Sequence, residues 1–245
     1  TDEKSKLLRD IIDSIFSVIM KITQIIISLA PIGVMGLMTK TVYSSGFGIF
    51  INLAKYMLTI ALGLSIHLFI ILPLILFFFL KINPIIHFKA MASAMLTAFS
   101  TSSSSATLPV TMKCVEENAG VSNEVSSFVL PMGATVNMDG TALYQAVAAV
   151  FISQALGMDL TISDQLTIIL TTVLASIGTA AVPAAGIIML IIILESVGVP
   201  SAGVALILGV DRILDMVRTT VNVTGDAAVA VSVASTEKQL KTYSK

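Results

Sequence analysis

The chain has 245 residues, of which 56% are hydrophobic and only 12% are charged, and its mean hydropathy is +0.96. An ordinary soluble domain carries roughly 25% charged residues, so this composition indicates an integral membrane protein. The net charge of −1 gives no general attraction to nucleic acid. The single cysteine, Cys114, excludes an internal disulfide, and there is no Cys/His cluster for zinc or iron. The first 13 residues are of mixed charge, do not resemble a signal peptide, and start abruptly, as though a segment preceded them.

Two long apolar segments come first, at residues 11–42 and 49–80. About 20 residues span a bilayer, so both are predicted transmembrane helices, the first tilted or kinked at Pro31. His67 lies in the second span without a carboxylate in register. We therefore expect a hydrogen-bonded structural histidine in preference to a proton relay.

The third segment is broken in the middle. Apolar arms at residues 85–99 and 108–115 flank a hydroxyl-rich run at residues 100–109, and neither arm is long enough to cross a membrane alone. We interpret it as a re-entrant hairpin, since non-helical backbone at membrane depth is tolerated only inside protein or beside a water-filled cavity. A serine-rich surface loop is the alternative.

A polar pair, Asn137 and Asp139, interrupts the next apolar helix, whose arms are residues 125–131 and 142–156. An ionisable group at membrane depth costs about 2.5–3.5 kcal/mol on insertion scales, so we expect an ion, a substrate or a charged partner to offset this cost. Nearby glycines loosen the helix, and an unwound turn would direct backbone carbonyls as well as side chains toward a hard cation. The alternative is a buried polar network that only holds helices together.

The same plan then repeats. Arms at residues 165–175 and 186–194 flank a second tip at residues 176–185, and a last span covers residues 205–233. Paired interruptions of this kind are typical of an inverted-repeat transporter, with the binding site where the hairpin tips meet. The predicted domains are two transmembrane helices (1–82), a hairpin with an unwound helix (83–158), a second hairpin with the final helix (159–236), and a tail (237–245).

Basic side chains mark the orientation of these elements. By the positive-inside rule they are cytoplasmic, so the first hairpin enters from inside, the second enters from outside, and the C-terminus is cytoplasmic. The residues are Lys4, Lys6 and Arg9 before the first span, Lys81, Lys89 and Lys113 around the first hairpin, and Lys238, Lys241 and Lys245 in the tail.

The last span carries a polar stripe. Spacings of 4, 3, 4 and 4 residues, at about 100° per residue, place five polar residues on one helix face, with Thr219 at its edge. They are Asp211, Asp215, Arg218, Asn222 and Asp226. Such a stripe predicts a wet or occupied cavity, and three carboxylates against one arginine predict that cations complete the charge balance. Alternatively, in the empty state Arg218 pairs back to Asp215.

Four ordered motifs carry a family resemblance. They are Ser102-Ser-Ser-Ser-Ala-Thr-Leu-Pro109, Asn137-Met-Asp-Gly-Thr141, Ser176-Ile-Gly-Thr179 with Val182-Pro183, and the stripe from Asp211 to Asp226. Together they resemble the glutamate transporter family, sodium-coupled symporters of dicarboxylates and amino acids. The whole chain takes part, but it resembles only the family's C-terminal part, transmembrane segments five to eight with both hairpins.

The resemblance implies a fold and a function. The fold is an all-α membrane protein with an inverted repeat and two re-entrant hairpins, the second of them the extracellular gate. The function is sodium-coupled symport of L-aspartate or L-glutamate by an elevator-like alternating access. The protein is then a multi-pass protein of the cell (inner) membrane and a homotrimer, through N-terminal scaffold segments that this chain lacks.

The resemblance also implies substrate-binding residues. Arg218 would hold the side-chain carboxylate with help from Thr141, and Asp215 would take the ammonium group. The α-carboxylate region would contact Asn222, Thr219 and the backbone near Ser104 and Val182.

Sodium ligands follow from the same resemblance. One ion would lie between carbonyls of Gly133, Asn137 and Asn222 and the carboxylate of Asp226. A second would use carbonyls of Thr135, Ser176, Ile177 and Thr179. A third would involve Asn137 and Asp139.

The sequence departs from the family's pattern at a few positions. An arginine that relatives often carry at one of two positions is absent here, where Ser102 and Met216 stand, and Ala181 and Ala184 replace glycines, which is expected to stiffen the second tip. A symporter of C4-dicarboxylates or neutral amino acids, coupled to sodium or protons, is the nearest alternative. An intramembrane aspartyl protease would need a Gly-x-Gly-Asp motif that the sequence lacks, and a passive ion channel does not explain Arg218.

Overall fold

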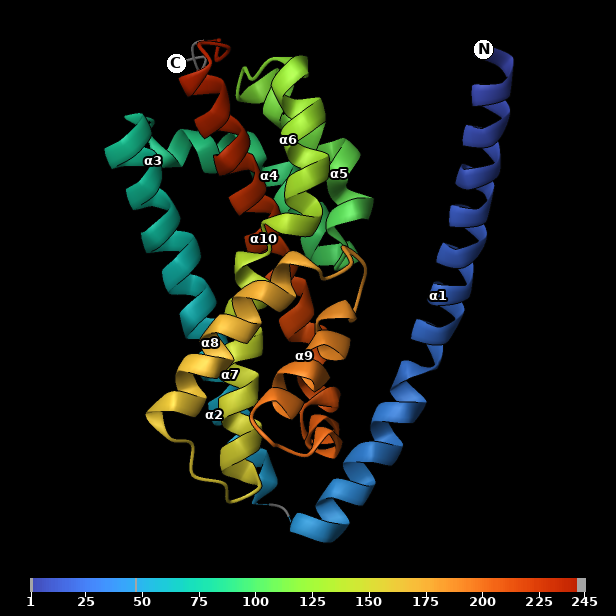
Figure 1. The fold of residues 1–245 in the computed structure, drawn as a ribbon, viewed down its shortest axis with the longest axis vertical. Helices are drawn as coiled ribbons and strands as arrows, with labels where there is room; N and C mark the ends of the chain where they lie inside the picture. Colours follow the sequence, from blue (N-terminus) through green and yellow to red (C-terminus); the bar gives the residue numbers. More distant parts are fainter. Residues whose placement is uncertain (1, 47, 242–245) are drawn as a thin grey trace. The chain divides into compact units, whose positions relative to one another are not determined.

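The computed structural model describes residues 2–46 and 48–241. Within these residues every regular element is a helix, apart from one isolated antiparallel bridge between Val121 and Leu240 (Figure 1). The all-helical class predicted from the sequence is therefore confirmed. The chain divides into two units, residues 1–47 and 48–245, which are described separately.

The first unit is the helix α1 (Asp2–Ser45), which runs for 44 residues and continues through Pro31. Its described side chains are mostly exposed and apolar, among them Ile22 and Ile32. A helix of this length and composition contains the first predicted span.

The second unit begins with the second predicted span, which forms α2 (Ile49–Ile66), a π-helical turn η1 (His67–Ile71) and α3 (Leu72–Leu80). The stretch Phe50–Leu80 is the one helix among the described residues that is long and apolar enough to cross a membrane. The π turn ends two residues before Pro73, whose ring would clash with the carbonyl four residues earlier in a regular α-helix. The wider turn leaves room for the proline without ending the helix.

Two helix–turn–helix pairs lie where the broken segments were predicted. The first is α4 (Pro84–Thr101) with α5 (Ser104–Lys113), and the second is α8 (Ile162–Ile177) with α9 (Ala185–Ser196). The first turn is shorter than the predicted tip of residues 100–109, because Ser103 caps α5 by accepting a 3.1 Å hydrogen bond from the Ala106 N–H. Most of the hydroxyl-rich run is therefore helical. A π turn, η2 (Cys114–Asn118), extends α5.

The polar pair breaks its helix as predicted. Helix α6 (Asn123–Val136) ends just before Asn137, and α7 (Asp139–Ala155) begins at the second member of the pair. Both Asn137 and Met138 lie outside helical backbone angles, so the backbone is unwound at the polar pair.

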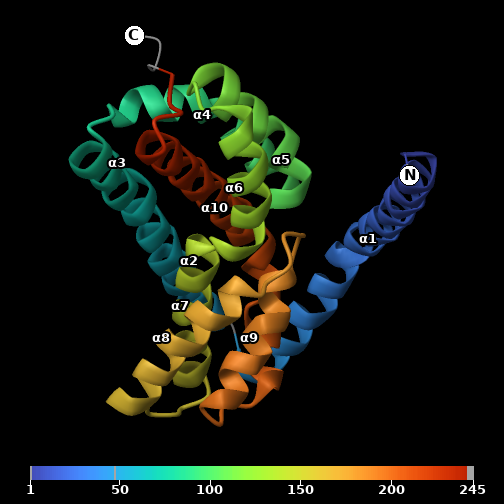
Figure 2. The same cartoon turned by 45° about the horizontal axis from the view of Figure 1, so that its top comes forward.

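Helix α10 (Leu208–Thr236), preceded by the short η3 (Ser201–Leu206), is the central element of the second unit. It contacts α2, α4, α5, α6 and α7 (Figures 1 and 2). Alanines such as Ala227 and Ala230 are fully buried along it, and small side chains let neighbouring helices approach closely. After α10 the chain turns back to the start of α6, where the Lys241 N–H donates to the Gly120 carbonyl at 2.8 Å. The last part of the predicted tail, including Lys245, lies outside the described residues.

Candidate functional site

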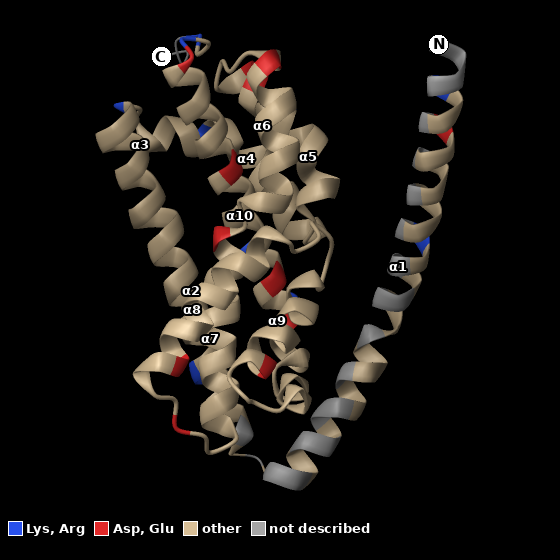
Figure 3. Cartoon of the chain, in the orientation of Figure 1, with Lys and Arg blue, Asp and Glu red and all other residues tan. Residues whose placement is uncertain are grey.

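All five residues of the predicted stripe on α10 are buried. Their exposed fractions are 3% to 4%, although three are carboxylates and one is a guanidinium. The prediction of one buried polar face is therefore confirmed. Figure 3 shows acidic residues within the middle of the second unit, away from its ends.

A small cavity of about 20 Å³ lies beside this face, between α10, the start of α7 and both turns. All seven residues predicted to bind substrate line it, namely Ser104, Thr141, Val182, Asp215, Arg218, Thr219 and Asn222. Six further residues line it that were not predicted to contact substrate, namely Ser102, Met138, Thr179, Ala180, Ala181 and Gly186. The structure thus brings the predicted set together around one space, while their roles stay predictions.

Arg218 and Asp215 form a buried ion pair, with Nη2 of the arginine donating to Oδ1 of the aspartate. The second carboxylate oxygen of Asp215 accepts a 3.0 Å hydrogen bond from the backbone N–H of Ala184, in the second turn. The pairing proposed for the empty state is therefore present. Asp215 joins the arginine to the turn between α8 and α9.

Tyr144 contacts the guanidinium and is itself hydrogen-bonded to Asp211. The Cζ atom of Arg218 lies 4.3 Å from the centroid of the Tyr144 ring, a cation–π contact, and the Tyr144 hydroxyl donates to Asp211 Oδ1 at 2.5 Å. Sequence analysis did not single out Tyr144. Its position one turn after Thr141, on the same face of α7, was the signal that could have found it.

One donor of Arg218 is left without a partner. Within the part of the chain that the structure describes, Nη1 is buried and has no hydrogen-bond acceptor. A Cβ atom added to Gly186 would lie 2.7 Å from it, so the glycine lets the start of α9 approach the guanidinium. A buried unsatisfied donor costs about 1–3 kcal/mol, and a ligand that supplies an acceptor would remove this cost.

Asn222 and Thr141 tie α10 to α7 by two hydrogen bonds. The Asn222 Nδ2 donates to Thr141 Oγ1 at 2.9 Å, and the Thr141 N–H donates to Asn222 Oδ1 at 3.3 Å. A Cβ atom added to Gly140 would lie only 2.8 Å from the Arg218 carbonyl oxygen. Glycine at this position therefore sets how closely the two helices approach.

Three of the residues predicted for the first sodium meet at the unwound turn. Asn137 Nδ2 donates to Asp226 Oδ1 at 3.1 Å, and a Cβ atom added to Gly133 would lie 2.8 Å from the same oxygen. Asn222, the fourth predicted ligand, lies one helical turn before Asp226 on α10. Carboxylate, amide and carbonyl oxygens are ligands that hard cations prefer.

Asp139 has a partner that sequence analysis missed. Its Oδ2 lies 2.5 Å from Nε2 of His67, in the π turn of the second span, and its Oδ1 accepts from the Gly140 N–H at 2.9 Å. The expectation that His67 has no carboxylate in register was wrong. The two residues are 72 positions apart in the sequence, and only the packing of α2 and α7 brings them together.

The predicted ligands of the second sodium lie on α6 and at the end of α8, and these two helices contact each other. Ser176, Ile177 and Thr179 lie at the C-terminal end of α8, where the last carbonyls of a helix lack intrahelical partners. Thr135 lies on α6, which contacts α8, but its side chain is exposed and its hydroxyl donates to the Met132 carbonyl at 3.1 Å. No hydrogen bond between Thr135 and the end of α8 occurs among the described residues.

The two turns meet above the cavity. The Ser103 hydroxyl donates to the Ala181 carbonyl at 2.8 Å, and the Ser105 N–H donates to the same oxygen at 3.2 Å. This contact joins segments almost 80 residues apart, and both turns line the same cavity as Asp215 and Arg218. The tips predicted to meet are therefore in contact.

A larger cavity, of about 610 Å³, lies between α2 and α7. Its lining includes Lys55, Tyr56, Thr59 and Phe151 and none of the predicted site residues. It is open at the side and lacks the buried carboxylates and guanidinium of the small cavity. We therefore place the candidate site at the smaller one.

Comparison with known proteins decides the family. The chain matches the model of the sodium:dicarboxylate symporter family over residues 1–236. It belongs to this family. The chain is 49% identical over 226 residues to excitatory amino acid transporter 3 of Mus musculus and of Homo sapiens, and 45% identical over 227 residues to excitatory amino acid transporter 1 of Mus musculus. These alignments cover 92% of this chain but only 43% or 42% of the relatives, so the chain spans less than half of their length.

Membership confirms the resemblance carried by the four motifs. The names of the family and of these relatives describe transporters, so the comparisons give no support to the protease alternative. Among the described residues, no group of three His, Cys, Asp or Glu side chains is suited to a metal. A sodium ion at the unwound turn would therefore rely on amide and backbone carbonyl oxygens in addition to Asp226.

Proposed function

We propose that the protein is a sodium-coupled symporter of acidic amino acids, L-aspartate or L-glutamate, in the cell (inner) membrane. The family's name supports sodium and dicarboxylates, and the relatives named excitatory amino acid transporters support an amino-acid substrate. The observation that carries the proposal is the buried Arg218, which has a free donor beside a cavity lined by both turns.

The substrate's two kinds of charge fit the two ends of the buried ion pair. A carboxylate is the acceptor that matches a planar guanidinium in a bidentate arrangement, and Nη1 of Arg218 has no acceptor among the described residues. When a substrate carboxylate takes the guanidinium, Asp215 is released to pair with the substrate ammonium. Binding then exchanges one buried ion pair for two.

Charge balance supports coupling to cations. If the three buried carboxylates of α10 are ionised, they and one guanidinium leave a formal charge of −2 in the interior. An acidic amino acid adds one more negative charge, and uncompensated buried charge is strongly destabilising. We propose that sodium at Gly133, Asn137, Asn222 and Asp226 supplies part of the missing charge, with Asn137 and Asp139 and the end of α8 holding further ions.

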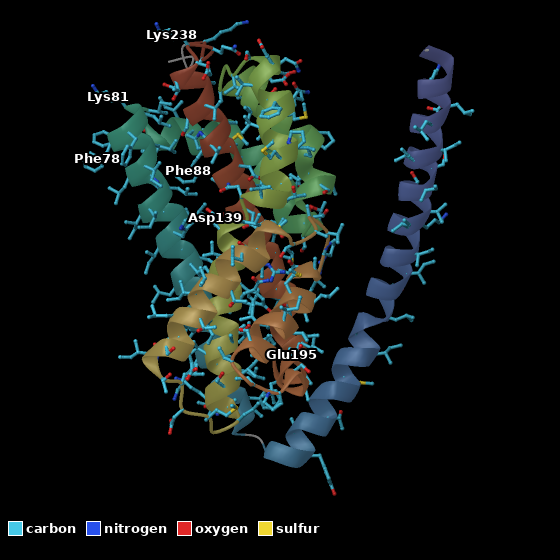
Figure 4. All side chains as sticks on the ribbon, in the orientation of Figure 1. Phe78, Lys81, Phe88, Asp139, Glu195 and Lys238 are labelled. Atoms are coloured by element: carbon cyan, nitrogen blue, oxygen red, sulfur yellow. The ribbon has the colours of Figure 1, made fainter. Side chains whose placement is uncertain are left out.

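The arrangement of the turns supports a proposal for how the site moves. We propose that the pairs α4–α5 and α8–α9 are re-entrant hairpins of an inverted repeat, that the second is the extracellular gate, and that the C-terminus is cytoplasmic. An elevator-like motion of this unit against a trimeric scaffold then carries the site across the membrane. Basic residues near Lys81 and Lys238, at one end of the second unit, support this orientation (Figure 4).

A binding titration of L-aspartate against sodium concentration tests the function. The purified protein is expected to bind aspartate more tightly as sodium rises. Replacing Arg218 by Cys removes the partner of the substrate carboxylate, at a cost of roughly 3–5 kcal/mol, so acidic substrates lose affinity by more than about 100-fold while serine or alanine gain it.

Arg212 is the matched control for this titration. It lies on the same helix but is exposed to solvent, so Arg212→Cys should bind aspartate like the parent. Unchanged aspartate affinity in Arg218→Cys would show that Arg218 does not bind the substrate's side-chain carboxylate. If the protein binds succinate tightly and does not bind aspartate, a C4-dicarboxylate symporter would instead be favoured.

The sodium ligand is tested separately through Asp226. Coupling between two sites is reciprocal, so each ligand tightens the other by the same factor. In Asp226→Asn the apparent aspartate affinity should fall most at low sodium and recover partly at high sodium. A loss that is equal at all sodium concentrations would argue against a cation there, and Asp164→Asn, at an exposed cap of α8, serves as the control.

A further inference from the structure

The corner where α3 meets α4 exposes an unusual set of side chains. Phe77, Phe78 and Phe79 close α3 with exposed fractions of 58%, 68% and 81%, and Lys81 follows in a left-handed backbone conformation. We call the set formed by these residues together with Ile85 and Lys89 the α3–α4 corner. Figure 4 shows Phe78 and Lys81 projecting from this end of the second unit.

The outward face of α4 continues the corner. Its inward face is marked by the buried His87, Met91 and Ala94, whereas Ile85 and Lys89, four residues apart, are exposed. Residues four apart lie on the same helix face. The corner thus combines a large apolar surface with two ammonium groups at its edge, and long lysine stems can lie along such a surface while the charge stays in the polar region.

Neither lysine has an acidic partner among the residues that the structure describes. Residues 14–115 contain no Asp or Glu, and none of the ion pairs formed by the described residues involves Lys81 or Lys89. Lys113, by contrast, lies 4.0 Å from Glu117. Acidic residues at this end lie near the beginning of α6 and at the end of α10 (Figure 3). Positive charge is therefore uncompensated at the corner.

We propose that the α3–α4 corner binds an anionic phospholipid, with the headgroup phosphate on Lys81 and Lys89 and an acyl chain along Phe77 to Phe79. Anionic headgroups are attracted to basic groups at the membrane surface, while the aromatic surface is covered by acyl chains. A zwitterionic lipid fits less well, because the corner offers no carboxylate to its ammonium group. The proposal depends on the chain being a membrane protein and is independent of which substrate it transports.

Lipid binding to the purified, delipidated protein in detergent tests this site by native mass spectrometry. Dioleoyl phosphatidylglycerol should bind in preference to dioleoyl phosphatidylcholine, and inorganic phosphate alone should not displace it. Each change of Lys81 or Lys89 to Gln should weaken phosphatidylglycerol binding about fivefold, the equivalent of about 1 kcal/mol per surface lysine, so Lys81→Gln/Lys89→Gln loses about 25-fold. Binding of phosphatidylcholine should not change.

Matched variants distinguish this site from a general effect of charge or hydrophobicity. Lys113→Gln removes a lysine that already has an acidic partner and should keep the parent's affinity. Phe78→Ser should weaken binding more than Phe128→Ser, on α6, where the exposed fraction is a similar 66%. Thermal unfolding in the same detergent checks that each variant is folded. An unchanged preference for phosphatidylglycerol in the double lysine variant, or an equal loss in Lys113→Gln, would overturn the proposal, as would displacement by inorganic phosphate.

Discussion

The two turns that close over the candidate site are built differently. The turn between α4 and α5 is two residues, Ser102 and Ser103, and both are only 2% exposed. The turn between α8 and α9 covers residues 178–184, and its exposed members include Gly178, Ala180 and Ala184. One turn is short, polar and buried, while the other is long, rich in alanine and partly open.

The bonds that hold the turns also differ. Ser103 fixes the first turn within its own hairpin, since its hydroxyl caps α5. The start of the second turn is also held within its own hairpin, since the Thr179 hydroxyl donates to the Ala175 carbonyl at 2.9 Å. Its later part has additional bonds to other elements, through the Ala184 N–H on Asp215 and the Ala181 carbonyl on Ser103 and Ser105. A segment whose bonds depend on another element opens more readily than one that holds itself.

This difference indicates which turn moves. The partner of Ala184 is Asp215, the residue that we propose to release from Arg218 when substrate binds. Substrate binding therefore acts directly on the anchor of the second turn and only indirectly on the first. We infer that the second turn is the mobile gate and that the first is a fixed wall of the site.

The largest predicted effect comes from Asp215→Asn, which removes the charge that faces Arg218. Breaking a buried ion pair costs about 3–5 kcal/mol, so thermal unfolding in detergent should shift strongly to lower temperature. Hydrogen exchange should rise at residues 178–184 and stay low at Ser102 and Ser103. Equal exchange in both turns would show that Asp215 does not anchor the second turn selectively.

Ser103→Ala should have an intermediate effect. The change removes a helix cap worth about 1 kcal/mol and a buried hydrogen bond to Ala181 worth about 1 kcal/mol. A loss of about 2 kcal/mol of stability is expected, with looser contact between the two turns. Ser100→Ala is the control, because that hydroxyl is exposed and bonds only to the Thr97 carbonyl of its own helix. If the two variants unfold alike, the link between the turns contributes nothing to stability.

Much of this architecture could be predicted from local sequence. Apolar length located the long helices, short apolar arms located both helix–turn–helix pairs, and the spacing of Asp211 to Asp226 predicted one buried face. Each of these features depends only on a continuous stretch of residues. The extent of the first turn was wrong because serine and threonine are typical of loops and also of helix caps, and only the Ser103 cap distinguishes the two.

Contacts between distant segments could not be predicted in this way. The pairing of His67 with Asp139 and of Tyr144 with Asp211 depends on how α2, α7 and α10 pack. The spacing of residues within one helix does not indicate which residue of another helix they will contact. The same holds for the Ala184 N–H on Asp215. These three contacts connect the site to the rest of the unit, so the sequence predicted the chemistry of the site better than its connections.

The smallest predicted effects come from replacing each of two alanines in the second turn by glycine. These changes test directly whether the second turn is held less firmly than the first. Ala184 has a φ of 62°, a left-handed conformation that costs an L-residue about 1–2 kcal/mol relative to its usual regions, whereas Ala181 has no positive φ. Ala184→Gly should therefore stabilise the protein by up to about 1 kcal/mol, because relief of strain exceeds the added freedom of the unfolded chain. Ala181→Gly only adds that freedom and should destabilise by about 0.5–1 kcal/mol. Thermal unfolding of both variants in one detergent gives the answer, and shifts of the same sign would mean that strain at Ala184 does not limit the second turn.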